Sequence, residues 1–393
     1  MKTINGVVDD PTRSSGFRMW AIALSISALG VTPAASQQAK YVVAEPRAAS
    51  GPHADLNFTQ EQEIAALESK PAKKVQPGRV WIANRIPGSV DLYDARTGTR
   101  LASVRVGNGT LDLALPPDVG KIYASDESSG TISVVDVNTL ERVAVIPTGA
   151  GTQPHHMDAN PDGTLVYVSL HGTNKLAAVD TATDTLAWVV TLGPPGALVH
   201  GTAIDAAGDT LWVTNGSGGP YFAINELDAY TGQVRRTKAV DFDWSEVALG
   251  KNETTLLASD KTMNRIRMFD IATLDEIGFA PVPQPPDTMS LTNDGKTLLV
   301  GLRGTPATCA FVHLETLTTT VLPLSSATGT STGHQDLSSN SKWGFMAVDG
   351  VNAPPQIAVL DMENQAVHAR WPDPGRPHGV IFEPLPDSDP DSD

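Results

Sequence analysis

A short segment rich in β-branched and aromatic residues recurs seven times, and this repeat constrains the fold more than any other feature. The spacing between successive copies averages about 44 residues, and no stretch of helical periodicity interrupts the series. Units of about 40–45 residues that hold four short strands are typical of β-propeller blades. The residues at the centres of the seven copies are Ile82, Tyr123, Tyr167, Trp212, Leu257, Leu299 and Phe345.

Each copy is the anchor of a larger unit. A second strand ending in Asp follows it, as in Thr131–Asp136, then a third strand such as Glu141–Ile146. A fourth strand ends in a turn before the next anchor, as in Met157–Gly163. One such unit cannot bury its own faces, so neighbouring units must pack radially. We therefore expect an all-β protein, a seven-bladed β-propeller over residues 79–384.

The two ends of the series predict how the ring closes. The first anchor, at Val80, has no inner strand before it, and the last strand, Pro377–Glu383, has no anchor after it. Joining them completes the first blade with the C-terminal strand and removes the open sheet edge.

The regions outside the repeat differ in composition. Residues 1–36 resemble a signal peptide, with cationic residues, an apolar run over 19–31 and a small-residue cleavage site; a buried strand or an uncleaved anchor is the alternative. Residues 37–78 read as a linker with a short helix over 59–68, and residues 385–393 as a disordered acidic tail. We expect a monomer in the periplasm or secreted, with no membrane span after signal cleavage.

Composition excludes several partners and cofactors. With 28 Lys and Arg against 44 Asp and Glu, the net charge is −16, which disfavours nucleic acid. The single cysteine, Cys309, excludes an intramolecular disulfide and a cysteine-based zinc site. A small molecule, a metal ion or a protein remains as partner.

The motifs resemble a known family. The sequence is similar to YVTN-family β-propeller repeat proteins in three features. These are the anchor Leu211–Asn215, the following strands with the pattern Val-x-Val-x-Asp, and the inner strand with its turn, Pro154–Gly163. The resemblance implies a seven-bladed propeller that is commonly exported. Its relatives and look-alikes include binding proteins, cell-surface proteins, lactonases, lyases and propeller subunits of redox enzymes, so the fold does not define an activity.

Five of the nine histidines share one register. We aligned the inner strands on the first residue of the turn that follows each strand. Four and five positions before that residue lie two positions, and in four of the seven blades at least one of them is a histidine. The remaining blades offer carboxylates there, and all of these side chains should converge at one mouth of the central channel. The register residues are His155, His156, His200, His334, His378, Glu246, Asp287 and, by a looser match, Asp112.

Histidine with carboxylate is the usual ligand set for divalent transition metals, and it also supplies acid and base groups. The predicted metal ligands are His156, His200, His334, His378 and Glu246; the predicted ligand-binding residues are His155, His200, Asp287 and Arg303, which follows the sixth anchor; the predicted catalytic pair is Glu246 and His156. A purely structural role, with each imidazole bonded to the backbone of the next blade, stays open.

Three functions follow from this register. One is an exported binding or scaffold protein that holds a small ligand or a metal ion (copper, zinc or calcium) at the channel mouth. The second is a metal-dependent enzyme, lyase or lactonase-like, and the third a propeller subunit of a redox complex. Whether the protein is an enzyme stays open.

Two further residues were considered. Ser331 lies in a sequence pattern that matches the serine-hydrolase elbow, but it lacks the strand–turn–helix context that the elbow needs. His171, which follows the third anchor, is a further candidate for the rim of the channel.

Overall fold

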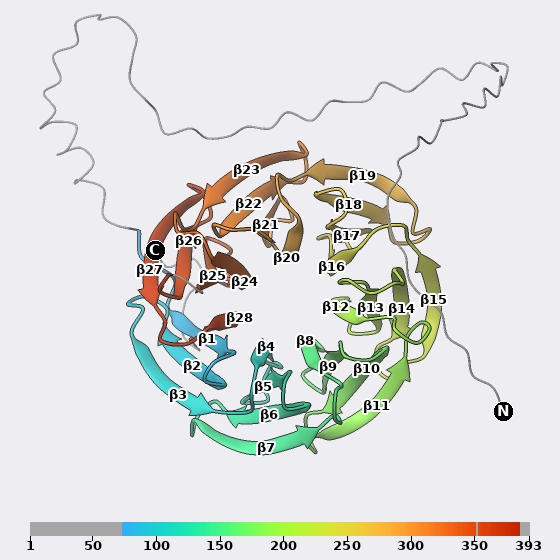
Figure 1. Ribbon diagram of the computed structural model, residues 1–393, viewed down its shortest axis with the longest axis horizontal. Helices are drawn as coiled ribbons and strands as arrows, with labels where there is room; N and C mark the ends of the chain where they lie inside the picture. The colour runs from blue at the N-terminus through green and yellow to red at the C-terminus, as the bar shows by residue number, and fades with distance from the viewer. Residues whose placement is uncertain (1–72, 351–352, 386–393) are drawn as a thin grey trace, which may run out of the picture. The chain divides into compact units, whose positions relative to one another are not determined.

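The computed structural model describes residues 73–350 and 353–385. All of the regular secondary structure within these residues is β-strand. These strands form seven four-stranded antiparallel sheets arranged as the blades of a ring (Figure 1). The predicted seven-bladed β-propeller is confirmed. The predicted signal peptide, the helix over 59–68 and nearly all of the acidic tail lie outside the described residues.

The first four blades, each given from its inner to its outer strand, are as follows. Blade 1 holds β28 (Pro377–Pro384), β1 (Gly78–Asn84), β2 (Ser89–Asp94) and β3 (Arg100–Arg105). Blade 2 holds β4 (Thr110–Ala114), β5 (Lys121–Asp126), β6 (Thr131–Asp136) and β7 (Glu141–Pro147). Blade 3 holds β8 (Pro154–Ala159), β9 (Leu165–Leu170), β10 (Lys175–Asp180) and β11 (Thr185–Thr191). Blade 4 holds β12 (Val199–Ile204), β13 (Thr210–Asn215), β14 (Ala223–Asp228) and β15 (Val234–Ala239).

The last three blades repeat this arrangement. Blade 5 holds β16 (Trp244–Leu249), β17 (Thr255–Asp260), β18 (Arg265–Asp270) and β19 (Glu276–Pro281). Blade 6 holds β20 (Pro286–Leu291), β21 (Thr297–Leu302), β22 (Thr308–His313) and β23 (Thr318–Pro323). Blade 7 holds β24 (Thr330–Leu337), β25 (Trp343–Gly350), β26 (Gln356–Asp361) and β27 (Ala366–Pro372).

The ring closes through the first blade, as the sequence predicts. Strand β28 pairs antiparallel with β1, from Gly78 opposite Pro384 to Asn84 opposite Pro377. Figure 1 shows the two strands side by side although they come from opposite ends of the described chain. This pairing covers the edge of β1 that would otherwise be open.

The core lies in the interfaces between neighbouring blades. Between blades 7 and 1, Trp371 stacks on Tyr93 with ring centroids 6.1 Å apart, and Phe345 stacks on Phe382 at 5.4 Å. Because each blade shares such a cluster with the next, the ring fixes the position of every inner strand around the channel. Among the residues that the structure describes, no helix is long and apolar enough to cross a membrane.

Candidate metal centre

Every inner strand carries a β-bulge at the same place. In β12, Val199 lies opposite Asn215 and Thr202 lies opposite Val213, so two residues of β12 face one residue of β13. All seven inner strands repeat this mismatch. Bulges re-aim side chains and are common beside functional sites. The bulged pairs are Leu111–Asp112, His155–His156, His200–Gly201, Ser245–Glu246, Asp287–Thr288, Gly333–His334 and His378–Gly379, which are the two positions of the predicted histidine register.

A hydroxyl on the second strand supports the bulge in four blades. A bulge leaves a backbone N–H without its ladder partner, and an unpaired buried N–H is unfavourable. In blade 3, the N–H of His156 donates to Ser169 Oγ at 3.0 Å, and in blade 5 the N–H of Glu246 donates to Ser259 Oγ at 2.8 Å. Ser125 and Thr214 do the same in blades 2 and 4. The Ser or Thr of the anchor segment therefore holds the backbone that carries the site.

Glycine fills the bulge positions where blades approach most closely. A Cβ at Gly201 would lie 2.6 Å from the carbonyl oxygen of Ser245, and a Cβ at Gly379 would lie 2.8 Å from that of Leu111. Both distances are too short for a side chain. The glycines thus let neighbouring inner strands come together, which brings the larger side chains of the other bulges into contact.

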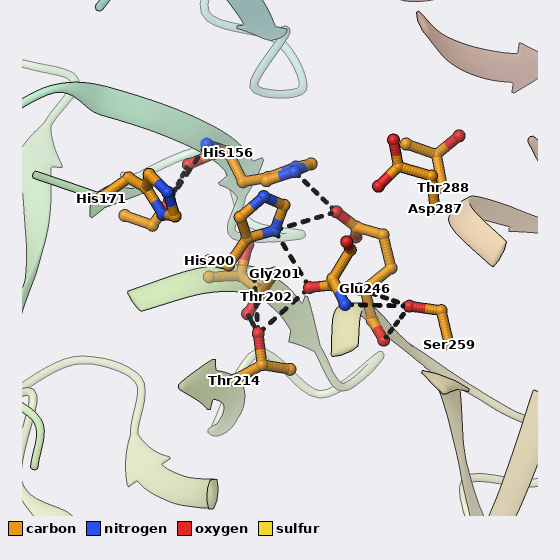
Figure 2. A network of polar contacts seen from close by, with 12 residues as sticks. His156, His171, His200, Gly201, Thr202, Thr214, Glu246, Ser259, Asp287 and Thr288 are labelled. Carbon is orange, nitrogen blue, oxygen red and sulfur yellow. Dashed lines mark hydrogen bonds and ion pairs between the residues drawn. The ribbon is translucent and has the colours of Figure 1, made fainter. Parts of the chain in front are cut away.

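Asp112 is the centre of one cluster. Its Oδ1 lies 3.0 Å from Nδ1 of His334, and its Oδ2 lies 3.6 Å from Nδ1 of His156. The other ring nitrogen of His156, Nε2, lies 2.7 Å from Oε1 of Glu246, as Figure 2 shows. Asp112, His156 and His334 are buried, come from blades 2, 3 and 7, and offer three ligand atoms within 4.8 Å of one another.

The electrostatics of this cluster depend on its two carboxylates. Burial by itself would raise the pKa of Asp112, but His334 and His156 hold it well below its ordinary value. Burial would lower the pKa of His156, but Glu246 and Asp112 raise it to about 10. Asp112 and Glu246 therefore favour positive charge between them, either a proton on His156 or a metal ion that replaces that proton.

Three further imidazoles lie next to this cluster. The ring centroids of His155 and His200 are 4.6 Å apart, those of His155 and His171 4.9 Å, and those of His171 and His200 5.1 Å. Burial lowers the pKa of all three, well below the ordinary value for His155 and His200. These histidines are neutral and can offer a nitrogen lone pair to a ligand.

The remaining predicted residues are placed differently. His378 contacts His334, with ring centroids 4.8 Å apart, and burial lowers its pKa well below the ordinary value. Asp287 and Arg303 pair with each other, Oδ1 to Nε at 2.9 Å, and the Arg303 side chain is half exposed. Ser331 lies near the start of β24, and no helix follows in the described part of the chain.

A cavity of about 1010 Å³ opens from the Asp112 cluster. Its lining includes Asp112, His156, His334 and Glu246 and extends to the ends of the inner strands. Two carboxyl groups that the predicted register omitted, Asp158 and Asp336, also line it, and burial raises the pKa of Asp158 to about 7 and of Asp336 to about 6. Each lies two residues beyond a register histidine, and strand alternation by two is the pattern that could have identified them.

Comparison with known proteins assigns the chain to a family. The model of the YNCE-like β-propeller family matches residues 66–312, so the chain belongs to that family. This match bears out the β-propeller repeat and does not single out the YVTN family. A comparison with curated protein sequences finds no match.

Two solved structures are similar in fold. One is titled "Kuenenia stuttgartiensis Hydrazine Synthase", with a TM-score of 0.60, 18% identity, and coverage of 75% of this chain and 98% of that one. The other is titled "Dihydro-heme d1 dehydrogenase NirN in complex with DHE", with a TM-score of 0.57, 14% identity, and coverage of 81% of this chain and 78% of that one. At these identities the likeness supports the fold alone.

Proposed function

We propose that this protein is an exported metal-binding β-propeller that holds a divalent transition-metal ion in its channel on Asp112, His156 and His334. The observation that carries the proposal is the meeting of three buried ligand atoms from three blades within 4.8 Å. Export rests on the signal-peptide character of residues 1–36.

The distances fit a metal of this class. Zinc binds nitrogen and oxygen at about 2.0–2.2 Å, so two ligand atoms of a tetrahedral site lie about 3.3–3.6 Å apart. Nδ1 of His334 lies 3.0 Å from Oδ1 of Asp112 and Nδ1 of His156 lies 3.6 Å from its Oδ2, so each imidazole stands near that separation from one oxygen of the carboxylate. Small shifts of the side chains would complete the site.

The surroundings also fit a metal. A ligating histidine usually donates its other N–H to a carboxylate, and Glu246 stands at Nε2 of His156 in that position. Two imidazoles with one carboxylate suit zinc, copper or iron, whereas calcium prefers six or more oxygen ligands. Among the expected metals, this set therefore favours zinc or copper over calcium.

The large cavity beside the Asp112 site leaves room for a small molecule to reach the metal. With three protein ligands, a coordination position stays available toward the cavity of about 1010 Å³. A small molecule with an oxygen or nitrogen donor could bind there. We therefore assign the protein a binding function at this position.

A metal-dependent reaction is the second candidate, favoured by the same cavity. A metal with an open position polarises a bound oxygen and can activate water, which is the chemistry that lyases and lactonases need. In this case Glu246 would orient His156, and the ligand in the cavity would be a substrate. A role as a redox-complex subunit rests on fold likeness alone and remains a hypothesis.

Metal analysis of the purified chain tests the proposal. Zinc or copper should bind in one equivalent at the Asp112 site, and Asp112→Asn should weaken that binding at least ten-fold. His313→Gln is the matched control, because His313 contacts Thr297 and Gln365 at the end of β22 and stands outside the register. Equal binding by Asp112→Asn and the native protein would overturn the proposal.

A further inference from the structure

We infer that a pocket between the loops of blades 1 and 2 binds a small molecule through an anionic group, a carboxylate or a phosphate. The pocket has a volume of about 430 Å³, and its polar lining is Arg85, Arg376, Asn108 and Ser128. None of these residues belongs to the Asp112 site, so the inference goes beyond the proposed function and does not depend on it.

The pocket and the large cavity lie at opposite ends of the inner strands. Arg376 directly precedes β28 and Gly109 directly precedes β4, so the pocket lies where these strands begin. The large cavity reaches Glu383, near the end of β28, and Pro117, which follows β4. The lining of the cavity includes Asp and Glu but no Lys or Arg, whereas that of the pocket includes two Arg and no Asp or Glu. The two spaces therefore suit different ligands.

Backbone hydrogen bonds bring the two arginines together, although they come from opposite ends of the described chain. The N–H of Arg85 donates to the carbonyl of Arg376 at 2.9 Å, and the N–H of Arg376 donates to that of Ile86 at 3.0 Å. Gly375 allows this approach, because a Cβ there would lie 2.9 Å from the carbonyl oxygen of Ile86. Ring closure thus places both arginines at one pocket.

A carboxylate outside the pocket holds each guanidinium in place. Nη2 of Arg85 lies 3.0 Å from Oε2 of Glu127, and Nε of Arg376 lies 3.0 Å from Oδ2 of Asp349. Neither carboxylate lines the pocket. Nε and Nη1 of Arg85 and Nη1 of Arg376 bond to no acceptor among the described residues. Because a guanidinium is always charged and presents its donors in a rigid fork, these groups can bind a carboxylate or a phosphate.

A third guanidinium lies beside the pocket. Nη1 of Arg105 lies 2.6 Å from the carbonyl oxygen of Pro87, which lines the pocket. Arg105 forms no ion pair with the residues that the structure describes. It therefore adds a positive charge that no ion pair offsets, and this favours an anion.

The rest of the lining combines neutral donors with an apolar side. The side chains of Ser128 and Asn108 bond to no other group in the described ranges. Gly109 has a positive φ of 69°, and a Cβ there would lie 2.5 Å from Ser128 Oγ, so the glycine lets this hydroxyl approach. Ile86 and Pro87 supply the apolar side. Such a lining suits a small organic acid or an organic phosphate.

Isothermal titration calorimetry at low salt tests the inference, with inorganic phosphate and succinate as probes. The native chain should bind one equivalent of at least one probe, and the tighter probe shows whether the group is a phosphate or a carboxylate. Arg376→Gln should weaken binding about ten-fold or more, because a charge-assisted hydrogen bond is lost. Ser128→Asp should do the same, because it adds a carboxylate to the pocket and leaves both ion pairs in place.

Two variants are the controls. Ser128→Asn has the shape of Ser128→Asp without its charge, and Arg142→Gln changes an exposed arginine of β7 outside the pocket. Both should bind the probes as the native chain does. No saturable binding of either probe by the native chain, or equal binding by Ser128→Asp and Ser128→Asn, overturns the inference.

The anion pocket and the metal site fail separately in this design. Asp112→Asn should keep the anion binding, and Ser128→Asp should keep the metal. Loss of phosphate binding in Asp112→Asn with unchanged binding in Arg376→Gln overturns the inference, because the phosphate would then be a ligand of the metal.

Discussion

Single hydroxyls support the functional backbone of this propeller. In four blades a Ser or Thr of the anchor segment lies opposite the bulge and accepts the N–H that the bulge leaves free. The anchor motif is therefore more than a strand marker, since one of its residues shapes the channel.

Removing one such hydroxyl should destabilise the protein. In Ser169→Ala the N–H of His156 loses its acceptor, and we expect the free energy of unfolding to fall by about 1–3 kcal/mol. Urea unfolding measures this change. Thr316→Ala is the control, because Thr316 is exposed and its hydroxyl bonds to that of Thr318, and it should change stability by less than about 0.5 kcal/mol. Equal effects of the two changes would show that the bulge needs no cap.

The lone cysteine should be chemically silent. Cys309 is fully buried in β22, and burial raises the pKa of its thiol. A thiol reagent such as Ellman's reagent should therefore leave the native protein unlabelled at pH 8 and react fully after guanidinium unfolding. Stoichiometric labelling of the native protein within minutes would contradict this description of β22.

Among the elements, β28 determines whether the ring exists. It is the inner strand of blade 1, and it also packs Phe382 against Phe345 of blade 7. Its bulge supplies His378 to the channel. One strand thus joins the first and last blades and lines the site.

Phe382→Ala should weaken the closure. The side chain is buried, and truncating such a residue costs about 3–5 kcal/mol. Truncation after Arg376, which removes the whole of β28, should abolish cooperative unfolding, because β1 becomes an unpaired edge. Truncation after Leu385 keeps every described strand and is the control. A cooperative transition after truncation at Arg376 would refute the role assigned to β28.

At the scale of the whole molecule, ring closure creates the site. Asp112 and His334 are 222 residues apart in the chain and 3.0 Å apart in the structure. The three residues of the Asp112 cluster come from three different blades. The channel chemistry therefore belongs to the folded ring and not to any blade.

A metal should consequently stabilise the ring as a unit. A ligand that binds only the folded state at 100 times its Kd adds about 2.7 kcal/mol per site to the free energy of unfolding. Thermal unfolding with zinc should show the gain, and a chelator should reverse it. Asp112→Asn should lose this gain. A midpoint that zinc does not change would count against the Asp112 site.

The sequence predicted the blade number, the closure and the histidine register because each depends on local patterns repeated at a regular spacing. It predicted that His156 and His334 lie at the same level along the channel axis. It did not predict how far apart the two side chains lie across the channel. It gave Asp112 only a looser match, although Asp112 is the centre of the cluster. Asp287 and Arg303 were predicted at the mouth, where they pair with each other.

Sequence alone therefore determined the seven-bladed propeller and the level at which its polar residues gather, since strand alternation and turn spacing are local. Only the tertiary structure decided which side chains meet, because contact across a channel depends on ring closure, on the bulges and on the close approach at Gly201 and Gly379. His171 shows the difference, since it stands outside the register in sequence and beside His155 and His200 in space.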